Sequence, residues 1–240
     1  MDETLEILYQ DEYVVAINKP SGLLVHKSLI DKKEKRYAMK ILRDQISRWV
    51  YPPHRLDKPT SGVLLFALSK EIARDLSEAF KQREIKKTYY AVVRGFTPNE
   101  GMIDHPLVEK LDKISDKNAK KDKPAQEAKT YFKTISTIEL PFAVSKYDSV
   151  RYSLVKLEPK TGRKHQLRRH MKHISHHILG DTKYGRGEHN RFIREKFAIH
   201  RLMLHCSALE FLHPVTKKKI TITAPFPEEF YKFGFDQCSI

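Results

Sequence analysis

The chain of 240 residues contains 45 Lys and Arg against 30 Asp and Glu, which gives a formal net charge of +15 at pH 7. This excess of positive charge favours a polyanionic partner, either a nucleic acid or an anionic membrane surface. The membrane ranks lower, because no segment combines a long apolar face with a basic one and no apolar run approaches the roughly 20 residues that span a bilayer. The N-terminus has no secretory signal pattern, and the two cysteines, Cys206 and Cys238, cannot build a disulfide framework. We therefore expect a folded, cytoplasmic protein that binds nucleic acid.

Short apolar segments separated by turn residues dominate the first part of the chain. Strands are expected over residues 5–10, 13–20, 22–26, 63–67 and 86–95, and helices over residues 36–48 and after Ser69. Ser69 can cap its helix, whose apolar face would consist of Ile72, Ala73, Leu76, Ala79 and Phe80. The second half has strands expected over 130–139 and 151–159, helices over 163–174 and 190–199, and a closing hairpin of 201–214 and 217–225. This mixture predicts an α+β fold with a largely antiparallel sheet.

Residues 109–129 differ from the rest of the chain, because they are charged, mixed in sign and nearly free of large apolar groups. Such a composition is typical of a charged surface excursion. A linker between two domains is the alternative. We favour the excursion, because strand-like sequence resumes directly after it, as in one interrupted sheet.

The stretch HRLDKPTSGVLLFA, residues 54–67, places one carboxylate between two cations. Asp57 lies between Arg55 and Lys58, and nearby positive charge keeps a carboxylate ionised. The Pro-Thr-Ser-Gly turn that follows exposes the residue, and the apolar run over 63–67 fixes the loop from behind. A structural salt bridge would give the same pattern, so these residues leave a catalytic acid and an ion pair as equal alternatives.

The stretch TGRKHQLRRH, residues 161–170, is rich in cations and also contains Gln166. A Thr-Gly turn opens the expected helix, and helix N-termini with Arg and Lys nearby suit phosphate groups. The candidate side chains are Arg163, His165, Gln166, Arg168 and His170. The alternative is a solvated basic helix face.

Histidines continue beyond this stretch, at His173, His176 and His177. With His170 they would share one helical face, so a zinc site must be weighed. No Cys or acid joins them at ligand spacing, and we predict no metal site.

The stretch KKTYYAVVRG, residues 86–95, reads as a strand that carries two tyrosines. Alternation places Tyr89 and Tyr90 on opposite faces, so one can be buried while the other faces a cleft. An aromatic ring in a basic cleft is a suitable platform for a flipped base. Core packing is the usual role of a strand aromatic, and we expect it for Tyr90.

Together the three stretches resemble the pseudouridine synthases of the RluA-like family. HRLDKPTSGVLLFA matches the Asp-bearing loop motif of the family, KTYYAVVRG the Tyr-bearing strand motif, and TGRKHQLRRH the third motif. The segments ILYQDEYVVAINKPSGLLVH and LMLHCSALEFLHP fit as well. The resemblance implies a single catalytic domain over residues 1–240, with a bent, largely antiparallel mixed sheet split by a basic RNA-binding cleft.

The resemblance also implies an activity, the isomerisation of uridine to pseudouridine in RNA without a cofactor or metal. It assigns catalysis to Asp57, to Arg168 as its basic partner, and to Tyr89 stacked on the uracil. Arg55 would fill the space that the flipped base leaves, and Leu204 would form the apolar wall of the uracil pocket. The full expected RNA-binding set is Arg55, Thr60, Arg163, His165, Gln166 and Leu204.

Several loops, among them VHKSLIDKKEK and KYGRGEHNRF, are similar to those of family members that act on tRNA. We therefore expect a specific uridine in the T-arm of a tRNA as the substrate, with a ribosomal RNA as the alternative. A non-catalytic RNA-binding or chaperone module is an alternative of another class, and the intact set of Asp57, Tyr89 and Arg168 argues against it. A metal-dependent hydrolase built on the histidines is a third. Because Met1 lies close to the first family motif, no N-terminal S4-type RNA-binding domain is expected, and neither a protein partner nor membrane contact is predicted.

Overall fold

The computed structural model describes residues 4–27, 34–109 and 124–235. They form two compact units. Unit 1 contains the described residues of Met1–Lys87, Val108–Ala125 and Cys206–Ala224, and unit 2 those of Thr88–Leu107, Gln126–His205 and Pro225–Ile240. Among the described residues, no helix is long and apolar enough to cross a bilayer. The single catalytic domain expected over residues 1–240 remains a prediction.

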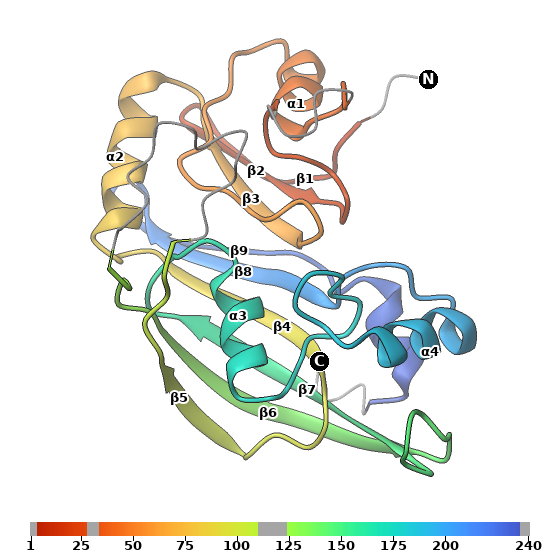
Figure 1. The fold of residues 1–240 in the computed structure, drawn as a ribbon. Helices are drawn as coiled ribbons and strands as arrows, with labels where there is room; N and C mark the ends of the chain where they lie inside the picture. Colours follow the sequence, from red (N-terminus) through yellow and green to blue (C-terminus); the bar gives the residue numbers. More distant parts are fainter. Residues whose placement is uncertain (1–3, 28–33, 110–123, 236–240) are drawn as a thin grey trace. The chain divides into compact units, whose positions relative to one another are not determined.

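Unit 1 is built on strands in the order β1-β2-β3-β8-β9 (Figure 1). The strands are β1 (Ile7–Gln10), β2 (Val14–Lys19), β3 (Ser61–Ala67), β8 (Leu204–Leu212), which enters the unit at Cys206, and β9 (Lys219–Thr223). The β1–β2, β2–β3 and β8–β9 pairs are antiparallel. All seven residues of β3 are buried, as expected for an apolar run without alternation.

Two helices accompany this sheet, α1 (Ala38–Ile46) and α2 (Lys70–Lys81) (Figure 1). Ser69 caps α2, since its hydroxyl oxygen accepts a hydrogen bond from the Ile72 backbone N–H at 3.2 Å. Leu76, in the middle of the predicted apolar face, is buried. The capped amphipathic helix expected after Ser69 is confirmed.

Unit 2 has strands in the order β4-β7-β6-β5, and all three pairs are antiparallel (Figure 1). The strands are β4 (Lys86–Arg94), which enters the unit at Thr88, β5 (Glu100–Asp104), β6 (Lys129–Leu140) and β7 (Val150–Pro159). The helices are α3 (Gln166–His173), α4 (Gly187–Phe197) and a 3-10 helix, η1 (Glu228–Phe233). The α+β class and the largely antiparallel sheet are therefore confirmed, while the bend and the basic cleft remain predictions.

The structure corrects two expected elements and adds one strand that the sequence did not predict. Residues 22–26 form no strand, because the carbonyls of Leu24 and Val25 accept hydrogen bonds from the first two N–H groups of α1 instead of a sheet partner. The strand β5 was not predicted. The helix expected from residue 163 begins at Gln166, after His165 in the left-handed conformation at φ 56°. Of the predicted excursion over 109–129, residues 110–123 lie outside the described residues.

Candidate active site

The Asp57 loop leads directly into the buried strand β3 of unit 1. Asp57 is half-buried, and its backbone carbonyl accepts a hydrogen bond from the Thr60 N–H at 3.0 Å, which closes the turn. At the start of β3, Gly62 has φ +107°, and a Cβ there would lie 2.1 Å from the Cys206 carbonyl oxygen. Only glycine fits this close approach of the two backbones. These turn residues thus hold Asp57 close to the start of the buried strand β3.

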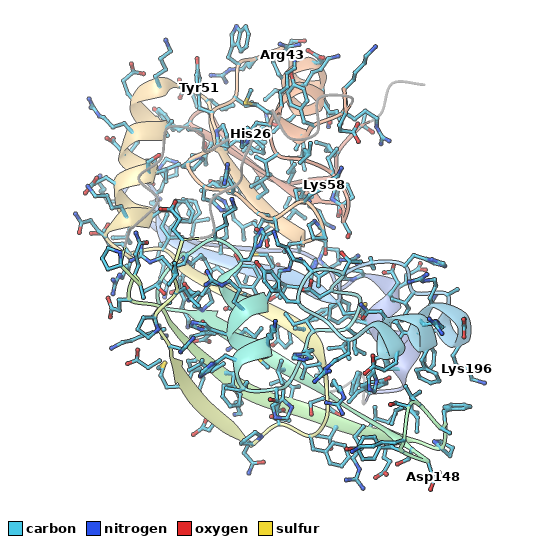
Figure 2. The ribbon with its side chains drawn as sticks, viewed as in Figure 1. His26, Arg43, Tyr51, Lys58, Asp148 and Lys196 are labelled. Carbon is cyan, nitrogen blue, oxygen red and sulfur yellow. The ribbon has the colours of Figure 1, made fainter. Side chains whose placement is uncertain are left out.

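A buried lysine, which the sequence interpretation missed, fastens this loop to the preceding turn. Lys19 has no exposed surface, and its Nζ donates to the carbonyls of Pro20, Leu23 and Lys58 at 2.8, 2.9 and 3.1 Å. The Lys58 carbonyl also accepts from the Gly22 N–H at 2.9 Å. Figure 2 labels Lys58 on this loop. A lysine that ends the apolar run VVAIN was the available signal, since lysine is almost never fully buried unless its ammonium is paired.

The histidine before Asp57 is held as a neutral acceptor. The His54 Nε2 accepts a hydrogen bond from the Leu65 N–H at 3.1 Å, and its ring stacks on Phe80 with centroids 4.4 Å apart. Burial, aided by the charge of Lys87, lowers the pKa of His54 to about 3. His54 therefore supports β3 and carries no charge at neutral pH. Arg55, by contrast, is exposed to solvent.

In unit 2, Gln166 organises the third motif rather than projecting into solvent. Its amide oxygen accepts hydrogen bonds from the Thr161 hydroxyl at 2.7 Å and the Arg163 N–H at 3.0 Å. Its amide nitrogen donates to the Lys129 carbonyl and the Thr130 hydroxyl, both at 3.0 Å. All four contacts of this buried side chain stabilise the turn before α3 and join it to β6.

His170 extends this network one helical turn further on. Its Nε2–H donates to the His105 carbonyl at 3.1 Å, so its Nδ1 is the acceptor for the Thr130 hydroxyl at 2.9 Å. Burial lowers the pKa of His170 to about 4, so the ring is neutral. No three His, Cys, Asp or Glu side chains in the described ranges form a group that could hold a metal ion.

Arg168 projects from another side of α3 and is locked by an acid that the sequence interpretation missed. Its Nε and Nη2 donate to the two carboxylate oxygens of Asp181 at 2.7 and 2.8 Å. Burial pushes the pKa of Asp181 upward, but hydrogen bonds from Arg168 and from the Tyr184 and Lys183 amides outweigh it, so the pKa lies below its usual value. The Tyr184 ring completes the clamp, with the guanidinium carbon 5.2 Å from its centroid. The geometry fixes the plane of the guanidinium group.

The remaining predicted residues lie in unit 2 as follows. Tyr89 and Leu204 are buried, with exposed fractions of 8% and 3%. His165 is hydrogen-bonded through Nδ1 to the Tyr184 hydroxyl at 2.9 Å. Tyr90 is half-buried and packs edge-on against Phe226, with centroids 4.9 Å apart.

The predicted residues thus form two sets, one in each unit. Arg55, Asp57 and Thr60 share one loop of unit 1, whereas Arg168, its Asp181 clamp and the Gln166 network share unit 2. The Asp57–Arg168 pair joins residues of different units and remains a prediction, as do the roles of the individual side chains.

Comparison with known proteins identifies the family. The model of the RNA pseudouridylate synthase family matches residues 13–173. The chain belongs to this family. It is 54% identical to tRNA pseudouridine synthase C of Vibrio cholerae over 224 residues, and this alignment covers 93% of this chain and 92% of the relative. The protein of the same name from Haemophilus influenzae is 52% identical over 236 residues, which covers 97% and 99%. The resemblance to tRNA-acting members of the family is therefore confirmed.

Solved structures agree with this assignment. Human RNA pseudouridylate synthase domain containing 4 matches with a TM-score of 0.70 and 27% identity, over 97% of this chain and 94% of that chain. Human RNA pseudouridylate synthase domain containing 1, at 24% identity and a TM-score of 0.71, shares the fold over 95% of this chain and 85% of that chain.

Proposed function

We propose that this pseudouridine synthase isomerises one uridine in the T-arm of a tRNA. The observation that carries the proposal is the near full-length identity of 52–54% to relatives named tRNA pseudouridine synthase C. The cytoplasm, where tRNA is modified, is the location we expect. Ribosomal RNA is the competing substrate, and no feature of the described residues favours it.

The reaction breaks the N1–C1′ bond of the target uridine, turns the uracil and forms a C5–C1′ bond, after which C5 releases its proton and N1 takes one up. Asp57 supplies the ionised carboxylate for this chemistry. A loop tied down by Lys19 and by the Thr60 turn suits this role, because a carboxylate held in one place loses little freedom on meeting the sugar or base.

Arg168 would pair with Asp57 and keep it charged. A guanidinium has five N–H donors in a rigid fork, and Asp181 engages two of them at one edge. The clamp therefore presents an oriented arginine and is compatible with a second carboxylate partner. Tyr89 would stack on the uracil, and Leu204 would line its pocket. Arg55 would fill the space that the flipped base leaves in the RNA. Flipping the base costs on the order of a few kcal/mol.

The test is tritium release from C5-tritiated uridine in tRNA. We expect release by the wild type and none by Asp57→Asn, which keeps the shape of the side chain and removes its charge. The matched control is Asp75→Asn on the exposed side of α2, which should release tritium at the wild-type rate. RNA binding by Asp57→Asn should survive, and turnover by this variant would contradict the role of Asp57.

A pseudouridine map of tRNA and ribosomal RNA from cells lacking the gene identifies the substrate. Loss of one T-arm site in tRNA would support the proposal. Loss of a ribosomal RNA site would favour the competing substrate, and an unchanged map with retained RNA binding would favour the non-catalytic module.

A further inference from the structure

Helix α3 of unit 2 has one face that the site described above does not use. Gln166 and His170 face β6, and Arg168 is directed to Asp181. The remaining face carries Lys172 and His173, both exposed, and the half-buried Arg169. Figure 1 shows α3 beside the sheet of unit 2, where it packs on β7.

The charge of this face has one sign. From Lys160 to Gly180 the chain contains six Lys or Arg and not a single Asp or Glu. Several other cations of unit 2 are paired with acids, for example Lys129 with Asp104 at 3.1 Å and Arg151 with Glu139 at 3.2 Å. Within the described ranges, neither Arg169 nor Lys172 forms an ion pair. This face of α3 therefore presents concentrated positive charge on a helix.

A pair of stacked imidazoles adjoins these cations. The rings of His105, which follows β5, and His173 lie nearly parallel, with an interplanar angle of 12° and centroids 3.7 Å apart. The His105 backbone is held in place, because its carbonyl accepts the hydrogen bond from His170 at 3.1 Å. The stacking brings the charge of a protonated His105 directly against a second imidazole ring, which is unfavourable without an anion beside it.

We propose that this face of α3, formed by Arg169, Lys172, His173 and the adjoining His105, binds the phosphate backbone of the RNA substrate outside the target nucleotide and takes up a proton when it does so. The proposal rests on the proposed function, because it extends the RNA contact of the same enzyme. Phosphate is the occupant that fits, since the face offers cations and N–H donors without an acid to repel an anion.

The direction of the proton linkage follows from the groups that face the imidazole pair. On α3 these are Arg169, whose charge acts on His105, and His170, whose ring lies edge-on to that of His105 with centroids 6.5 Å apart. In the free protein, burial and the charges of His173 and Arg169 lower the pKa of His105. A bound phosphate opposes the like-charge repulsion and raises that pKa, so affinity for RNA should increase as the pH falls from 7.5 to 6.

The first experiment measures the Kd of the full-length protein for unmodified tRNA by fluorescence anisotropy over a range of salt. For Arg169→Gln/Lys172→Gln we expect roughly tenfold weaker binding near 0.1 M salt. The slope of log Kobs against log salt should become shallower by roughly 1.4–1.8, the value for two lost phosphate contacts. The matched control, Lys70→Gln/Arg74→Gln, removes two exposed cations from α2 and should leave both quantities unchanged. Equal Kd and slope in the α3 variant and the wild type would overturn the proposal.

The second experiment follows Kd from pH 7.5 to 6 in His105→Asn and His173→Asn. Each variant is compared with its own affinity at pH 7.5, and both should lack most of the gain in affinity that the wild type shows at pH 6. A full gain in both variants would refute proton uptake at the pair. The binding measurement does not depend on catalysis, so the two proposals can fail separately. If the wild type modified no tRNA but the α3 variant still bound RNA more weakly, the proposed function would fail and the proposed RNA-binding surface would stand.

Discussion

Replacing Asp181 by alanine removes the acceptor of four hydrogen bonds at once. Two come from Arg168, and two come from the backbone N–H groups of Lys183 and Tyr184, both at 2.9 Å. The side chains of Arg168 and Asp181 are only 6% and 1% exposed, so water cannot replace the lost partner. Leaving one member of a buried ion pair costs about 3–5 kcal/mol, and each orphaned amide about 1–3 kcal/mol. Because these costs overlap, we expect the free energy of unfolding to fall by about 4 kcal/mol.

Urea unfolding at pH 7, followed by far-ultraviolet circular dichroism, measures this loss, and a thermal scan should show a Tm lower by about 10 °C. Asp181→Asn keeps one oxygen for the two amides and should lose about half as much. The matched control is Asp104→Asn, whose ion pair with Lys129 is 54% and 40% exposed and should be worth less than about 1 kcal/mol. A loss in Asp181→Ala no larger than that of the control would refute the reasoning.

The same carboxylate predicts a pH dependence. The folded-state pKa of Asp181 is lowered, so its stabilisation is present above the unfolded value of about 3.9 and is lost as the pH falls through the folded pKa. The difference in stability between the wild type and Asp181→Asn should therefore shrink below about pH 4.

Two further predictions concern backbone approach and buried histidine. Gly62→Ala should destabilise the protein by more than about 3 kcal/mol, because its Cβ would lie 2.1 Å from the Cys206 carbonyl oxygen at φ +107°. Gly187→Ala, where no atom lies within 4 Å of the new Cβ, is its control in urea unfolding, and equal losses would refute the steric argument. The folded-state pKa of His170 is about 4, below the unfolded value of about 6.5. His170 should therefore lower the free energy of unfolding by about 2 kcal/mol between pH 7 and pH 5, because the unfolded chain takes up a proton that the folded one does not. His170→Asn should flatten this part of the stability profile, and an unchanged profile would contradict the neutral buried state.

The sequence predicted well the elements whose signal is local. The continuous apolar run of β3 and the serine-capped helix α2 lie where the pattern placed them, because burial and capping depend on residues a few positions apart. The short strand β5 was missed, since Glu100–Asp104 is extended only through its pairing with β6. The apolar residues of 22–26 predict a strand, but the carbonyls of this segment accept hydrogen bonds from α1 and Lys19 instead of from a neighbouring strand.

For the site, the short motifs around Asp57, Tyr89 and Arg168 by themselves indicated the family, because each motif is a run of neighbouring residues that can be recognised without the fold. What only the tertiary structure decided is how these side chains are held. Asp181 clamps Arg168 across 13 residues, Lys19 ties down the Asp57 loop across 39, and His105 stacks on His173 from a different element. No local pattern reveals such contacts, because the free energy of a buried hydrogen bond or stacked pair depends on which distant segments the fold brings together and seals from water.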